Sequence, residues 1–284
     1  MSSTQITLLK KYGLAVRGLS GQHLLIDPNI QRKIVELIAP KPEEWILEIG
    51  PGLGALTSEI LAAGACVVAV EKDKRFCEIL EGELGGDYKG KFQVVHADIL
   101  KTDLKKLAAR LKKRKLKVVS NLPYYITSPV LFWLIENRAY VEKAVLMMQR
   151  EVANRILAQP GNKDYGRLTL ALRFYAETHR AFDVSRNCFT PKPDVDSSVV
   201  VFDFYPPSKF PKGIDEDFLF YIVQTAFGAR RKTLLNRLLH DPALGKSRDE
   251  LLPILRELGI PEGARGEDLL LKDFISLAEA FKPR

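Results

Sequence analysis

The 284-residue sequence is poor in the residues that cross-link a chain or hold a metal ion. It has only three cysteines, Cys66, Cys77 and Cys188, and they form no C-x-x-C pair. We therefore expect reduced thiols in a cytoplasmic protein, because disulfide frameworks form from paired cysteines in oxidising compartments. The four histidines are not clustered at metal-ligand spacing, so the sequence predicts no metal site.

The sequence also lacks long hydrophobic runs. The longest, residues 60–70, is about half of the ~20 residues that a membrane-spanning helix needs. Residues 1–19 contain no long apolar region and no small-residue cleavage site, so we expect no signal peptide. These absences argue against an integral membrane protein and against a secreted protein.

Positive charge, in contrast, is in excess. The chain has 43 Lys and Arg against 35 Asp and Glu, for a net charge of +8. Residues 101–117 alone hold nine basic residues and one acid, a surplus equal to the whole net charge. Nucleic acid is a partner that such a run fits, and a solvated helix face is the other interpretation. The run by itself does not separate the two.

The first two-thirds of the chain alternates strand-like apolar runs with helical patterns. Runs typical of strands occur at residues 45–49, 66–70, 92–95, 117–120, 144–148, 168–177 and 198–204. Strands that alternate with helices favour a parallel, doubly wound α/β sheet.

A change of composition at residues 205–213, which hold three prolines and a glycine, predicts a linker. After it only helical periodicity is found, at residues 218–240, 248–258 and 268–281. We therefore expect two domains: an α/β domain over residues 1–206 and a small all-helical domain over residues 207–284.

A glycine-rich turn follows the first strand-like run. Gly50, Gly52 and Gly54 lie in the segment ILEIGPGLGAL, where glycine allows a tight turn and close approach of a ligand. Glu71, about 20 residues further on, ends the next strand and is placed to bind ribose hydroxyls. Gly50, Gly52 and Ala55 also satisfy G-x-G-x-x-A, so a nicotinamide or flavin dinucleotide fits the loop as well.

The acids near this loop favour a cationic cofactor. Glu48 lies within the first strand, Glu71 ends the second and Asp98 follows the third. Acids at the ends of three consecutive strands match the sulfonium cofactor S-adenosylmethionine better than an anionic dinucleotide, with Asp98 placed to accept from an adenine amine. The alternative for each is a helix cap or a loop carboxylate.

The segment Asn121-Leu122-Pro123-Tyr124 ends the fourth strand. An exocyclic base amine is a poor nucleophile, because its lone pair is delocalised into the ring. The Asn121 side-chain amide and the Leu122 carbonyl can accept its protons and turn the lone pair toward a methyl group. Pro123 fixes the backbone, and Tyr124 can stack on the base for roughly 1–3 kcal/mol.

These segments together resemble the rRNA adenine dimethyltransferase family, specifically its small-subunit, kasugamycin-sensitivity branch. The resemblance runs from about Gly21 almost to the C-terminus. It rests on GQHLL, EIGPGLGALT, VEKD, HADIL, NLPYYI, FTPKPDVDS and FGARRKTLLNRL, which occur in that order. The fold that it implies is a Rossmann-like methyltransferase sheet with a small helical C-terminal domain.

The resemblance and the residue chemistry together assign the site. The cofactor-binding residues are Gln22, His23, Leu25, Glu48, Gly50, Gly52, Glu71, Lys72, Asp98, Ile99 and Asn121. The catalytic residues are Asn121, Leu122, Pro123, Tyr124 and Phe189, where Phe189 packs on the target base from the face opposite Tyr124. The candidate RNA-binding residues are Arg230, Arg231 and Lys232, and secondarily Lys112, Lys113, Arg114 and Lys115.

The resemblance implies an enzyme that transfers methyl groups from S-adenosylmethionine to the N6 amines of two adjacent adenosines. The resemblance places these adenosines near the 3′ end of small-subunit (16S) rRNA. The implied partner is that rRNA in the assembling small ribosomal subunit, and the implied process is ribosome biogenesis. We expect a monomer. The chain departs from the family's pattern at residues 17–20 and at Leu24, which weakens the assignments of Gln22 and His23.

Three other interpretations are kept. A macrolide-resistance enzyme that methylates large-subunit rRNA shares the fold and the catalytic motif, although FGARRKTLLNRL favours the small-subunit branch. A non-catalytic nucleic-acid-binding factor on the same fold is disfavoured by the intact NLPY segment. A Rossmann dehydrogenase would bind a nicotinamide cofactor.

Overall fold

The computed structural model describes residues 4–14, 23–211, 213–229 and 231–281. The chain divides into two compact units, Met1–Ala153 with Glu177–Phe204, and Asn154–Ala176 with Tyr205–Arg284. The expected boundary at 206/207 lies close to the junction between Phe204 and Tyr205. The grouping of residues 154–176 with the C-terminal helices was not predicted, because a chain that leaves a unit and later returns gives no local signal.

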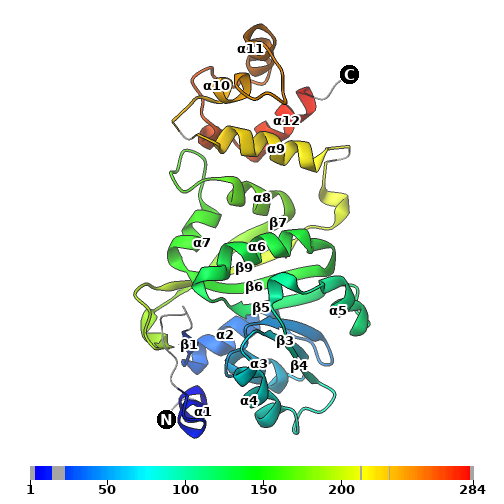
Figure 1. The fold of residues 1–284 in the computed structure, drawn as a ribbon, viewed down its shortest axis with the longest axis vertical. Coiled ribbons are helices and arrows are strands. Elements are labelled where there is room, and N and C mark those ends of the chain that lie inside the picture. The colour runs from blue at the N-terminus through cyan, green and yellow to red at the C-terminus, as the bar shows by residue number, and fades with distance from the viewer. Residues whose placement is uncertain (1–3, 15–22, 212, 230, 282–284) are drawn as a thin grey trace. The chain divides into compact units, whose positions relative to one another are not determined.

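The first unit is built on a seven-stranded sheet (Figure 1). Its strand order is β4 (Phe92–His96), β3 (Cys66–Glu71), β2 (Trp45–Ile49), β5 (Leu116–Asn121), β6 (Val141–Gln149), β9 (Ser197–Phe204) and β7 (Ala176–Val184). The pairs from β4 to β6 are parallel, and β9 pairs antiparallel with β6. This is the predicted doubly wound architecture.

The strand order reverses between β2 and β5, and that reversal positions the site. From β2 the chain proceeds outward through β3 and β4, and it then returns to the other side of β2 with β5 and β6. Crevices at such a switch point, beyond the carboxyl ends of the strands, are where α/β sheets bind ligands.

Helices cover the sheet because both of its faces are apolar. On one face Ile46 and Val67 belong to a core shared with α2 (Pro28–Ile38), α3 (Ala55–Ala62) and α4 (Lys74–Leu84). The alternate residues Leu47 and Val68 point to the opposite face and are fully buried too. The unit also contains α1 (Thr4–Lys11), α5 (Leu104–Arg110), α6 (Thr127–Glu136), the start of α7 (Arg150–Leu157) and the short ladder of β1 (Leu24–Leu25) with β8 (Phe189–Thr190).

The second unit is helical. It contains α8 (Arg167–Tyr175), α9 (Glu216–Phe227), α10 (Leu234–Leu239), α11 (Arg248–Glu257) and α12 (Leu271–Ala280). Tyr165, just before α8, is fully buried and donates a hydrogen bond from its hydroxyl to the Leu269 carbonyl at 3.0 Å. This contact ties the 154–176 segment to the C-terminal helices.

Two expected elements differ from the structure. Residues 168–177, expected as a strand, are mostly helix α8, which is buried on nearly all sides, so periodicity could not separate the two. The helix expected over 218–240 is broken after Phe227. There the Arg237 guanidinium packs on Gly228 and donates to the Thr225 carbonyl at 2.9 Å, and Thr233 caps α10.

The described cysteines are free thiols. Among the helices of the described segments, none combines the length and apolar character that crossing a membrane would require.

Candidate active site

A cavity of about 520 Å³ lies in the first unit, at the carboxyl edge of the parallel strands. The segments that follow β2, β3, β4 and β5 all line it, so the glycine loop and the NLPY segment share one site. The predicted residues that line it are His23, Leu25, Glu48, Gly50, Gly52, Glu71, Lys72, Asp98, Ile99, Asn121, Leu122, Pro123 and Tyr124. The predicted Gln22 lies outside the described residues.

The glycine loop takes a conformation that requires glycine. Gly50 and Gly52 have φ of 63° and 57°, in the left-handed region that other residues rarely adopt. A Cβ at position 52 would also lie 3.2 Å from Leu24 Cδ2. The loop therefore brings bare backbone to the cavity wall.

Glu71 is a fixed acceptor at the end of β3. Its side chain is buried, and its carboxylate accepts from the backbone N–H groups of Lys72 at 2.7 Å, Asp73 at 2.8 Å and Gly52 at 3.3 Å. Burial raises the pKa of Glu71, and these hydrogen bonds oppose that shift. The carboxylate is thus held in one orientation at the cavity wall.

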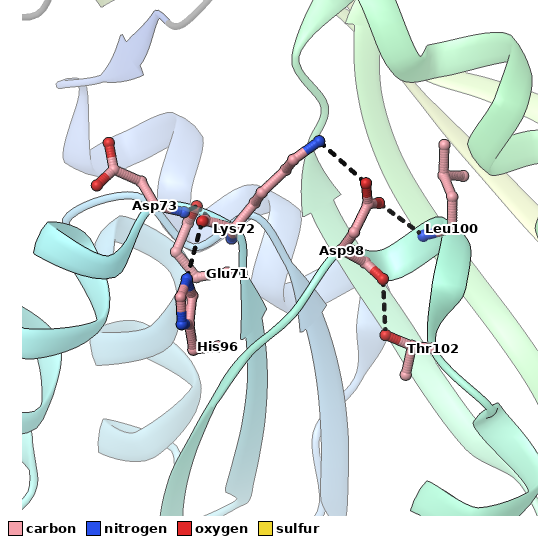
Figure 2. Close-up of polar contacts among 7 residues, drawn as sticks. All are labelled: Glu71, Lys72, Asp73, His96, Asp98, Leu100 and Thr102. Carbon is pink, nitrogen blue, oxygen red and sulfur yellow. Dashed lines mark hydrogen bonds and ion pairs between the residues drawn. The ribbon is translucent and has the colours of Figure 1, made fainter.

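Asp98 follows β4 and lines the same cavity as Glu71. Figure 2 shows Lys72 reaching toward it, with a distance of 3.0 Å between Lys72 Nζ and Asp98 Oδ2. The hydrogen bond from Lys72 lowers the pKa of Asp98 and keeps it ionised. Asp98 also accepts from the Leu100 N–H at 3.0 Å, so it caps the short helix Ile99–Lys101 and faces the cavity at once.

Glu48 is the most deeply buried acid of the site, with 2% of its surface exposed. The Thr57 hydroxyl, on α3, donates to Glu48 Oε2 at 2.5 Å. Burial, together with the charge of the neighbouring Glu71, raises the pKa of Glu48 to about 7, and the hydrogen bond from Thr57 opposes that shift. Near neutral pH this carboxyl is therefore poised to lose its proton when a cation enters the cavity.

The Asn121 amide is oriented by the backbone around it. Its NH₂ group donates to the His23 carbonyl at 2.9 Å, which leaves its oxygen as the atom available to accept. The Leu122 N–H donates to the Met147 carbonyl at 3.0 Å, so the neighbouring strand β6 holds the motif. The Ser120 hydroxyl fixes the same strand end to Ile49 at 2.5 Å.

Tyr124 stands beside His23, with 5.3 Å between the ring centroids. Its hydroxyl lies 3.2 Å from Ser197 Oγ, and burial raises its pKa, so the phenol is neutral. The next residue, Tyr125, also lines the cavity and is 61% exposed. Tyr125 and Thr57 were not among the predicted site residues, although they lie inside the NLPYYI and EIGPGLGALT segments respectively.

Phe189 is the predicted catalytic residue that the structure places elsewhere. Its side chain is 4% exposed and packs in the main core of the first unit, and its backbone pairs with Leu25 in the β1–β8 ladder. In this structure the ring is enclosed by core residues and does not line the cavity. Its stacking role therefore stays a prediction.

The second group of candidate RNA-binding residues, 112–115, lies at the edge of the sheet opposite the cavity. Lys112, Lys113, Arg114 and Lys115 form the loop before β5, at the amino end of a strand whose carboxyl end bears Asn121. Lys117, from the same basic run, is buried, donates to the Ala39 carbonyl at 2.8 Å and pairs with Glu44 at 3.0 Å. Much of the run is therefore structural or remote from the site.

The preferred basic group lies in the second unit, between α9 and α10. Arg231 and Lys232 are exposed, and Arg230 is outside the described residues. Arg237, which the helical spacing grouped with them, is used internally against Gly228 and Thr225. Over the described segments, no three His, Cys, Asp or Glu side chains gather as a metal site would require.

The chain is similar to known proteins over nearly its whole length. The family model described as ribosomal RNA adenine dimethylase matches residues 15–270. Proteins named ribosomal RNA small subunit methyltransferase A are 38% identical in Geobacillus sp. (strain WCH70) and 40% identical in Lysinibacillus sphaericus (strain C3-41), over 97% of this chain and 94% of each relative.

Two solved structures of methyltransferases are also similar to this chain. A dimethyladenosine transferase from Plasmodium falciparum has a TM-score of 0.77 at 27% identity and covers 90% of this chain and 96% of its own. The 23S rRNA methyltransferase ErmE has a TM-score of 0.68 at 26% identity. The match covers 91% of this chain and 99% of the ErmE chain. The chain therefore belongs to the ribosomal RNA adenine dimethylase family.

Proposed function

We propose that this chain dimethylates the N6 amines of two adjacent adenosines near the 3′ end of small-subunit (16S) rRNA. The chain is an rRNA adenine dimethyltransferase, and its methyl donor is S-adenosylmethionine. The observation that carries the proposal is the convergence of Glu71, Asp98 and Asn121 on one cavity. We place the reaction on the assembling small subunit in the cytoplasm and expect the chain to act as a monomer.

The cavity residues fit S-adenosylmethionine by their chemistry. Glu71 would accept from the ribose hydroxyls, and Asp98 from the adenine amine. Glu48 would supply negative charge to a cationic ligand, at the cost of the proton that it holds near neutral pH. When bound, the cofactor supplies a methyl group on a positively charged sulfur, which is open to attack by a weak nucleophile.

The chain's own residues would prepare that nucleophile. The Asn121 amide oxygen and the Leu122 carbonyl accept the two protons of the target amine, which turns its lone pair toward the methyl group. Tyr124 stacks on the base. Positioning of this kind supplies most of the rate, since a held pair of reactants avoids the entropy cost of meeting.

No dedicated base is needed for the proton balance. The nitrogen–methyl bond forms as the sulfur–methyl bond breaks, and the amine becomes cationic and acidic. It then loses a proton to solvent. A second round requires that the cavity accept the monomethylated base, whose remaining N–H can still donate to one of the two acceptors.

A large-subunit rRNA target is the second candidate, because the likeness to ErmE extends over 91% of this chain. We would incubate the protein with labelled S-adenosylmethionine and either unmethylated small subunits or large subunits. The proposal predicts label in small-subunit rRNA alone. Label in large-subunit rRNA would support the second candidate instead, and no label with either would remove both.

A further inference from the structure

Helix α1 is a part of the first unit that the family match does not include. The family model begins at residue 15, whereas α1 spans Thr4–Lys11. In Figure 1 this helix lies beside α4 and the β1 ladder. Its contacts connect it to the cofactor cavity.

The apolar side of α1 packs on residues that form the cavity wall. Leu8 is 8% exposed and belongs to a small core cluster with Leu24, Leu53, Phe76 and Ile79. Leu24, Leu53 and Phe76 also line the cavity. Leu24 in turn lies against Gly52 of the glycine loop, so α1 supports the surface on which the cofactor would rest.

Gln5 extends from α1 to the cavity itself. It is 4% exposed and lines the cavity, and Gln31 Nε2 donates to its oxygen at 3.3 Å and to the Leu25 carbonyl at 2.8 Å. No described residue accepts a hydrogen bond from the Gln5 NH₂ group. A buried amide whose oxygen is engaged therefore has a donor left for a ligand.

Glu83 on α4 anchors the other end of the helix. Its carboxylate accepts from Lys11 Nζ at 2.6 Å and from the Tyr12 hydroxyl. Exposed ion pairs contribute little singly, so we assign the main hold on α1 to Leu8 and the orientation of its end to Glu83. The helix is thus held at two points with Gln5 over the cavity.

We infer that α1 forms one wall of the cofactor site and that Gln5 donates its NH₂ group to an acceptor oxygen of bound S-adenosylmethionine. This inference rests on the proposed function, because it takes its ligand from there. It adds a cofactor-binding residue from outside the range that the family model matches.

The test compares Gln5→Met with Thr7→Met. Met keeps the length and packing of Gln5 but has no N–H, and Thr7 is an exposed residue of the same helix that does not line the cavity. Calorimetry with S-adenosylmethionine should show a Kd raised about 3- to 10-fold for Gln5→Met, as expected for one lost hydrogen bond. Thr7→Met should keep the wild-type Kd, and thermal unfolding should show both variants folded.

A second pair of variants tests the anchor without touching the cavity. Glu83→Gln weakens the hold on Lys11. Glu81→Gln removes a charge from the same helix, and Glu81 forms no ion pair with the described residues of α1. Glu83→Gln should speed cofactor dissociation in stopped flow, and Glu81→Gln should not.

An unchanged Kd for Gln5→Met, or equal changes in Gln5→Met and Thr7→Met, would overturn the inference and leave the proposed function intact. Equal dissociation rates for Glu83→Gln and Glu81→Gln would overturn the role of the anchor. If the wild-type chain does not bind S-adenosylmethionine at all, the proposed function fails, and this inference fails with it.

Discussion

Glu48 and Glu71 face the same cavity and are held in different ways. Glu71 accepts from backbone N–H groups of three residues, whereas Glu48 has a hydrogen bond from the Thr57 side chain and is the more deeply buried. Backbone donors favour the ionised form and burial opposes it. One residue type therefore provides both a fixed acceptor and a carboxyl whose charge responds to its ligand.

Glu71→Ala should weaken the binding of S-adenosylmethionine by at least about 10-fold, because hydrogen bonds to a charged acceptor are worth about 1.5–3 kcal/mol each. Calorimetry measures the Kd, and Glu78→Ala, on the exposed side of α4, is the control. A Kd that stays at the wild-type value would remove Glu71 from the cofactor site.

Glu48→Gln should change how stability depends on pH in the ligand-free protein. The pKa of Glu48 rises from 4.5 to about 7 on folding, which corresponds to about 3 kcal/mol. A carboxyl with a raised pKa stabilises the fold below its unfolded value and loses that contribution as pH rises through its folded value. The unfolding free energy of Glu48→Gln relative to wild type should therefore increase between pH 5 and pH 8 in urea titrations. Parallel pH profiles for the two proteins would contradict this account.

Among the elements, the segment before α8 shows how the second unit is held together. Tyr165 is fully buried, its ring lies 6.1 Å from that of Phe227, and burial raises its pKa to about 12. Its hydroxyl satisfies the backbone carbonyl of Leu269, a residue that is 3% exposed.

Tyr165→Phe should therefore lower the unfolding free energy by about 1–2 kcal/mol, the effect of one lost hydrogen bond that leaves a buried acceptor unpaired. Urea unfolding followed by circular dichroism measures this, with the partly exposed Tyr140→Phe as the control. The Kd for S-adenosylmethionine should not change, because Tyr165 belongs to the second unit. Equal stability of the two variants would count against the role of this contact.

The parallel strands and the acids at their ends were predictable from sequence because each is a local pattern: a β-branched run, a turn residue and a helix. The same holds for Asn121 and Tyr124. The features that could not be predicted from the sequence depend on contacts between distant segments. Gln31 reaching Gln5 and the enclosure of Phe189 in the core are tertiary facts, and no period or motif encodes them.

In the molecule as a whole, the net positive charge is not concentrated at the cavity. Lys112 to Lys115 lie at the far edge of the sheet, and Lys117 is internal. Asp98 and Lys72, which both line the cavity, form an ion pair. Binding energy for a large RNA must therefore come from outside the pocket, and it has to offset the few kcal/mol needed to extrude a base.

Arg231→Gln together with Lys232→Gln should weaken binding to the small subunit and flatten its salt dependence. Each lost phosphate contact lowers the slope of log K against log salt by about 0.7–0.9. Filter binding across a salt series, with Lys112→Gln and Lys113→Gln as the matched pair, separates the two surfaces. If the second pair alone loses affinity and slope, the RNA-binding surface is the loop before β5.

The most direct test of the whole account is the product made by Asn121→Ala. Unmethylated small subunits would be incubated with S-adenosylmethionine and either wild type or the variant, and the rRNA would be mapped by mass spectrometry. We predict two adjacent N6,N6-dimethyladenosines near the 3′ end with wild type. With the variant we predict almost none, at an unchanged Kd for the cofactor, because Asn121 holds the reacting amine. Full dimethylation by Asn121→Ala, or wild-type product at other nucleotides, would contradict the account.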